Sequence, residues 1–253
     1  MSDLPFVLVH GLIGTLQHDE VLRHFPAGTL APALLGYGPH AGVAPHHVHL
    51  EGQVEHLHAC ITAAFGPRPV VLVGHSVGGV VAALYAARYP ARVAQLVSVE
   101  GNFTLRDAFW SSRVAQMTPQ AADEMLLDIR QDPVGWLAGS GVAGAERMAD
   151  LAMRLLDDQP ASTIRAMARS VVEVTGKPDY LDQLHDLMHE VPIHLLAGER
   201  TREGWDVPDW AIPMAASFVE LPDVGHMMML EDAAGFAAAV RSCCRSLGEP
   251  LPA

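Results

Sequence analysis

Short runs of valine and leucine without polar alternation are the feature that most constrains how this chain folds. They occur as FVLV at residues 6–9, as VVLV at residues 70–73, and again within residues 92–101 and 191–199. A strand with apolar side chains on both faces is typical of a parallel sheet that helices cover on both sides. A stretch with apolar residues at helical spacing, residues 50–65, separates the first two runs.

This alternation predicts an α/β fold with a mostly parallel central sheet and flanking helices. Weaker strand patterns at residues 28–38 and 216–226 bring the expected number of strands to about six. The section from 103 to 188 contains only helical and loop patterns, so we expect a helical cap inserted into a core made of residues 1–102 and 189–253. A closing helix is expected from Glu231 to Leu247.

One hydroxyl stands where the second apolar run ends. Residues 74–78 read Gly-His-Ser-Val-Gly, between a predicted strand and the predicted helix that stops before Pro90. G-x-S-x-G in this context is typical of a nucleophile elbow, a sharp turn that exposes a serine at the carboxyl edge of the sheet. The helix that follows would point free N–H groups at the site. Ser76 is therefore the candidate nucleophile.

Three further stretches occur in a matching order. HGLIG at residues 10–14, LLGYG at 34–38 and LPDVGHMMMLEDAAGF at 221–236, taken with the serine motif, resemble the α/β-hydrolase family over nearly the whole chain. The resemblance implies a hydrolase core with a helical cap. It also implies that the family's usual first two strands are absent here, because the chain starts almost directly at the strand before HGLIG.

The resemblance and the chemistry together assign roles. A serine hydroxyl needs a base near neutral pH, and His226 is the candidate base. The oxyanion of a tetrahedral intermediate needs two fixed donors. We expect these to be the backbone N–H groups of Val77, at the helix start, and of Leu12, by analogy with the family's oxyanion loop. His10 and His75 are expected to be structural.

The acid of the triad departs from the family's common pattern. Where the family usually has an aspartate, after the strand that returns from the cap, this chain has Thr201, which cannot carry the charge that stabilises an imidazolium. Glu100, at the end of the strand after the nucleophile, is the preferred candidate. Asp206 and Glu199 stay open as alternatives, because each also satisfies the order Ser, acid, His.

The expected function is a carboxylesterase-like serine hydrolase that cleaves an ester-type bond of a small or medium, largely apolar acyl substrate. The cap is rich in Trp, Phe and Met, and Trp110, Trp136 and Met227 are the candidate substrate contacts. Thioesterase, lactonase and carbon–carbon bond hydrolase activities use the same triad and remain alternatives. An acyltransferase and a non-catalytic ligand receptor are alternatives of other classes.

The composition limits which kinds of partner the chain can bind. The formal net charge of −13 argues against nucleic acid and against an anionic membrane surface. The three cysteines form neither a metal-spaced set nor an evident disulfide framework, which fits a reducing cytoplasm. The histidines at 46, 47, 49, 56 and 58 lack the spacing of a zinc site, so we expect no metal and no cofactor. The sequence leaves the oligomeric state open.

Overall fold

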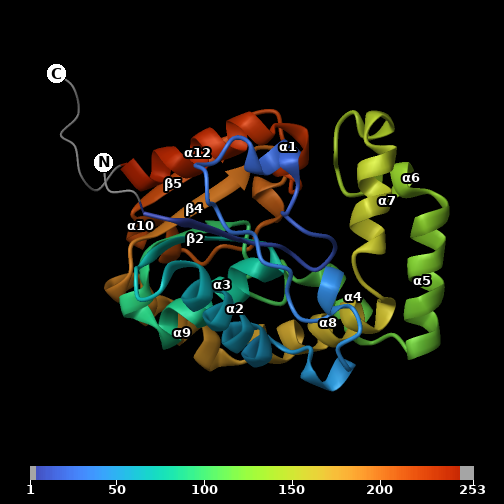
Figure 1. Ribbon diagram of the computed structural model, residues 1–253, viewed down its shortest axis with the longest axis horizontal. Coiled ribbons are helices and arrows are strands. Elements are labelled where there is room, and N and C mark those ends of the chain that lie inside the picture. The colour runs from blue at the N-terminus through green and yellow to red at the C-terminus, as the bar shows by residue number, and fades with distance from the viewer. Residues whose placement is uncertain (1–3, 246–253) are drawn as a thin grey trace.

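A parallel sheet forms the centre of the computed structural model, which describes residues 4–245 (Figure 1). Its five strands lie side by side in chain order, and every neighbouring pair is parallel. They are β1 (Phe6–Val9), β2 (Val70–His75), β3 (Val93–Val99), β4 (Ile193–Gly198) and β5 (Ser217–Leu221). The predicted α/β fold with a parallel sheet is confirmed.

The sheet has five strands rather than about six. Within the predicted strand at 28–38, only Leu30 pairs with β1, through bonds from its N–H to Phe6 O and from Leu8 N–H to its own carbonyl. Gly28 on one side has φ 83°, and Pro32 on the other has no N–H to donate. The segment therefore touches the sheet edge once and cannot extend a ladder.

Helices cover both faces of the sheet. On one face lie α2 (Leu50–Phe65), α3 (Val77–Arg88) and α9 (Pro178–Glu190), and on the other α1 (Asp19–Leu22) and α12 (Ala233–Arg245) (Figure 1). Alternate residues of one strand serve the two layers: Val7 and Val9 pack toward α3, whereas Phe6 and Leu8 pack toward α12. Two buried layers explain why the strands are apolar throughout.

The predicted closing helix is α12, which begins at Ala233 rather than at Glu231. A short helix, α11 (Met228–Glu231), ends just before it, and the backbone of Asp232 between them leaves the helical region at φ −141° and ψ 78°. The Asp232 carboxylate then accepts the N–H of Gly235 at 2.8 Å, which caps the start of α12. The predicted end at Leu247 lies outside the described residues.

Between β3 and β4 the described chain is helical. The helices are α4 (Phe109–Ala115), α5 (Pro119–Gln131), α6 (Pro133–Gly139), α7 (Ala149–Asp157), α8 (Ala161–Thr175) and α9. α5, α6 and α7 stand to one side of the sheet, and α4 packs against α8 (Figure 1). Helix α9, which falls within the predicted cap, packs against both α3 and α8. The division into a core and a cap at residues 103 and 188 stays a prediction.

The remaining elements are short. They are helix α10 (Ala211–Met214) and single helical turns at 38–40, 45–47, 90–92, 145–147 and 202–204.

Candidate active site

Ser76 sits alone between a strand and a helix. It follows the last residue of β2, precedes the first residue of α3, and has φ 53° and ψ −125°. A positive φ is strained for a residue with a Cβ, so the surrounding packing must hold the turn. A Cβ built on Gly78 would lie 2.3 Å from the His10 carbonyl oxygen, and one on Gly74 would lie 2.5 Å from that of Gly78. Only glycine fits at either position, as a nucleophile elbow requires.

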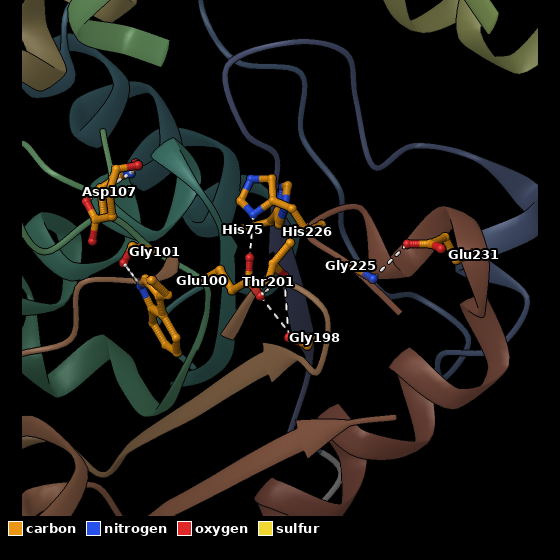
Figure 2. A network of polar contacts seen from close by, with 11 residues as sticks. His75, Glu100, Gly101, Asp107, Gly198, Thr201, Gly225, His226 and Glu231 are labelled. Atoms are coloured by element: carbon orange, nitrogen blue, oxygen red, sulfur yellow. Dashed lines mark hydrogen bonds and ion pairs between the residues drawn. The ribbon is translucent and has the colours of Figure 1, made fainter. Parts of the chain in front are cut away.

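Glu100 directly follows the neighbouring strand β3 and also has a positive φ, 44°. Its carboxylate is buried, with 4% of the residue exposed, and one oxygen lies 2.6 Å from Nδ1 of His226 (Figure 2). The other oxygen accepts the N–H of Gly198 at 2.8 Å and the hydroxyl of Thr201 at 2.6 Å. Burial by itself raises the pKa of Glu100, but the bonds from His226, Thr201 and Gly198 outweigh it and hold the pKa below its usual value.

Thr201 thus has a definite place beside the acid. It occupies the position where the resembling family usually carries its aspartate, and it donates a hydrogen bond to Glu100 instead. Asp206 lies elsewhere, accepting from the Thr104 hydroxyl at 2.6 Å and pairing with Arg106 at 3.5 Å. Glu199 accepts the N–H of Asp223. Of the three candidate acids, Glu100 is the one that contacts the His226 ring.

The backbone of His226 is held by His75, the residue before the candidate nucleophile. His75 Nε2 lies 2.9 Å from the backbone oxygen of His226, and the two rings lie 4.6 Å apart between centroids (Figure 2). A carbonyl oxygen only accepts, so His75 donates from Nε2. Burial, and next the proximity of His226, lower the pKa of His75 to about 3, so it stays neutral. A neutral His75 adds no positive charge beside the His226 ring.

The two expected oxyanion donors come from the turn after β1 and from the start of α3. Val77 is the first residue of α3, where a backbone N–H has no partner within the helix. Leu12 lies in the turn after β1, which is held by a bond from Tyr37 Oη to the Leu12 carbonyl at 2.9 Å. His10 Nδ1 contacts the Gly11 carbonyl at 2.9 Å and steadies the same turn. The oxyanion role of both N–H groups stays a prediction.

A cavity of about 630 Å³ opens on these residues. Ser76, Glu100 and His226 line it together, although they come from three distant parts of the sequence. The predicted substrate contacts Trp110, Trp136 and Met227 are on its wall. The sequence did not predict several further wall residues, among them Ile13, Asp107, Arg200 and Trp205. Nothing in the local pattern around Arg200 or Trp205 signals a position on a cavity.

Two further features of the described residues bear on function. Among residues 4–245, no group of three or more histidine, cysteine, aspartate or glutamate side chains is arranged to hold a metal ion. In the same part of the chain, no helix combines the length and the apolar character that crossing a membrane requires.

Comparison with known proteins identifies the family. The model of the alpha/beta hydrolase family matches residues 6–239. The chain belongs to this family. Membership identifies it as an enzyme of the hydrolase type.

Individual relatives of this hydrolase are distant. A Haemophilus influenzae protein provisionally named as a 2-succinyl-6-hydroxy-2,4-cyclohexadiene-1-carboxylate synthase is 24% identical, over 98% of this chain and 100% of the relative. An esterase from Thermogutta terrifontis is 22% identical with a TM-score of 0.67, over 97% of this chain and 91% of that one. MenH from S. aureus is 16% identical with a TM-score of 0.67, over 97% and 94%. At these identities the solved structures establish the shared fold.

Proposed function

We propose that the protein is a serine hydrolase that cleaves an ester bond of a small or medium, largely apolar acyl substrate. The observation that carries the proposal is the 2.6 Å contact between Glu100 and Nδ1 of His226 beside a strained serine on the same cavity. An acid on Nδ1 keeps the proton there and leaves Nε2 free to accept one. The strained backbone of Ser76, between β2 and α3, supports its role as the nucleophile.

The reaction proceeds through an acyl-enzyme. Ser76 Oγ attacks the carbonyl carbon of the ester while His226 Nε2 takes the hydroxyl proton, and the oxyanion accepts bonds from the N–H groups of Leu12 and Val77. The C–O bond then breaks, and His226 returns the proton to the departing alcohol. Water attacks the acyl-enzyme by the same route, releasing the carboxylic acid and restoring Ser76. Glu100 stays ionised throughout and offsets the charge on His226.

The cavity wall favours a substrate without a negative charge. Arg200 is the one lysine or arginine among the wall residues, and its guanidinium already bonds Glu231 and the Gly141 and Asp223 carbonyls. The acidic wall residues are Glu100 and Asp107. Asp107 binds the N–H of Phe103 and is held by its own loop, so neither acid is available to pair with a cationic substrate. Apolar side chains supply most of the remaining surface, which suits an alkyl or aryl acyl group.

The charges on the cavity wall also favour one kind of relative over another. The synthase named for the Haemophilus relative has a product with a carboxylate and a succinyl group, which are anionic near neutral pH. Binding several carboxylates needs cations that are not already paired. We therefore infer an esterase rather than a synthase of this kind. Thioesterase, lactonase and carbon–carbon bond hydrolase activities remain alternatives, and transfer of the acyl group to an added alcohol would mark an acyltransferase.

The test is covalent labelling joined to a substrate panel. A fluorophosphonate should label Ser76 stoichiometrically and abolish hydrolysis of p-nitrophenyl butyrate, and Ser76→Ala should prevent both. Ser112→Ala, a serine on α4 that is not part of the cavity wall, is the matched control. The p-nitrophenyl ester of succinate, in which a carboxylate replaces the terminal methyl group of the butyrate ester, should be turned over more slowly. If the folded protein is not labelled and its activity survives in Ser76→Ala, the proposal is wrong. The protein would then be a ligand receptor or use another chemistry.

A further inference from the structure

The loop that carries His226 is held at every residue from 223 to 226. Glu199 accepts the N–H of Asp223 at 2.8 Å, and Arg200 donates its own backbone N–H to the Val224 carbonyl at 3.0 Å. Glu231 accepts the N–H of Gly225 at 2.8 Å, directly before His226 (Figure 2). Loops are ordinarily the more mobile segments of a domain, so this much anchoring calls for a physical reason.

Glu231 is the centre of this anchoring. Its side chain is 5% exposed, and its two oxygens accept three N–H donors: that of Gly225, that of Ala143 at 3.0 Å, and a guanidinium N–H of Arg200. A buried carboxylate is stable only when its partners satisfy it, and charge-assisted bonds of this kind are strong. Glu231 therefore fixes Gly225 and Ala143 relative to one another.

Arg200 joins the same two segments from the other side. Its guanidinium donates to the Asp223 carbonyl in the histidine loop, and to the Gly141 carbonyl at 2.6 Å. The segments also touch directly, since a Cβ built on Gly225 would lie 3.3 Å from the Gly141 oxygen. Residues 141 and 143 follow α6, and Trp136, Gly139 and Ser140 of that region line the cavity.

We propose that the Arg200–Glu231 pair is a positioning element. It sets the ring of His226 relative to Ser76 and ties that placement to the α6 wall of the acyl cavity. The inference rests on the proposed function, because it takes His226 as the base. Displacing a reacting group by about 1 Å can lower the rate by about a hundredfold. This holds even when the mutation that causes the displacement is far from the reacting atoms. Loosening the pair should therefore lower turnover while leaving the cavity able to bind.

The experiment compares Glu231→Gln, Arg200→Met and the double variant with the native protein. Glutamine has one acceptor oxygen in place of two, so at least one of the three N–H groups loses its partner. The readouts are kcat, KM, melting temperature and the downfield proton resonance of His226 Nδ1–H in histidine labelled with ¹⁵N. The matched control is the surface pair of Arg88 and Glu55, which lie 2.6 Å apart with 48% and 49% of their side chains exposed. Arg88→Met and Glu55→Gln should leave all four readouts at native values.

Each single variant should lower kcat by about ten- to a hundredfold with KM within about twofold, and should broaden or shift the His226 resonance. The double variant removes both charges and leaves neither unpaired. Its melting temperature should recover toward the native value while kcat stays low. A purely structural pair would instead let kcat recover together with the melting temperature, and that result would overturn the inference.

A folded Glu231→Gln protein with native kcat and a native resonance would also overturn it. If that variant does not fold, the double variant carries the same comparison, because it also removes the Arg200 charge and leaves no charge of the pair without a partner. The resonance does not depend on any reaction. A perturbed resonance in a protein whose hydrolysis survives Ser76→Ala would therefore refute the proposed function and uphold the positioning role.

Discussion

Replacing Glu100 with glutamine is the sharpest single perturbation of this site. The Gly198 N–H and the Thr201 hydroxyl both donate to one carboxylate oxygen, at 2.8 and 2.6 Å. The glutamine must place its amide oxygen there, because the backbone N–H cannot reorient. Its NH₂ group is then directed at Nδ1 of His226, where the native carboxylate oxygen lies 2.6 Å away. Two donors would meet, so the His226 proton moves to Nε2.

In that tautomer His226 can no longer accept the Ser76 proton. The same change in the serine protease precedent lowers kcat by about ten-thousandfold. At about 1.36 kcal/mol for each factor of ten, this corresponds to roughly 5 kcal/mol of lost transition-state stabilisation. The fold should survive, because the volume is unchanged and the Gly198 bond is kept. The expected cost in the free energy of unfolding is about 1–3 kcal/mol, typical of one altered buried bond.

The assay is the turnover number on p-nitrophenyl butyrate, with urea unfolding as the measure of the fold. Asp206→Asn is the matched control, since Asp206 contacts Thr104 and Arg106 and should cost little. Glu199→Gln should also cost far less, since its amide oxygen still accepts the Asp223 N–H. If Asp206→Asn were inactive and Glu100→Gln close to native, the tautomer argument and the assignment of the acid would both be wrong.

Two further predictions concern the cavity and pH. Trp110→Ala and Trp136→Ala should each change the acyl chain-length profile across p-nitrophenyl esters more than the melting temperature, since both rings line the cavity; an unchanged profile in both would leave them as packing residues. His10 accepts the Leu34 N–H on Nε2, and burial lowers its pKa to about 4. In the unfolded chain a histidine becomes protonated below about pH 6.5, whereas His10 in the folded protein stays neutral down to a lower pH. The free energy of unfolding should therefore fall by about 2 kcal/mol between pH 7 and 5 because of His10. His10→Asn should flatten this pH dependence, as measured by urea titrations. Parallel pH curves for the two proteins would contradict it.

The strand pattern and the serine motif were readable because their causes are local. Unbroken apolar runs predict strands buried on both faces, and β1 to β4 follow them closely. The helix at residues 50–65 is observed with the predicted bounds. Glycines at 74 and 78 flanking Ser76 reflect contacts made within one turn and its adjoining strand. The strand at 28–38 was wrong because hydrophobic composition alone does not supply the N–H groups that a ladder needs.

The carboxylate that contacts His226 was predictable only as a choice among three residues. Chain order admits Glu100, Asp206 and Glu199 equally, and distance to the His226 ring separates them. That distance depends on the register of β3 against β4, which places the end of one strand beside the loop after the other. Thr201 illustrates the same point, because its bond to Glu100 joins residues a hundred positions apart.

The sequence by itself therefore determined the sheet and the turn at Ser76 and singled out His226 as the candidate base, since each depends on neighbours along the chain. Tertiary structure alone decided which carboxylate meets His226, which side chains enclose the cavity, and that Arg200 and Glu231 hold the histidine loop to residues 141 and 143. These contacts join segments from separate elements. Their energies depend on burial and on distances of a few tenths of an ångström, which no local pattern of residues encodes.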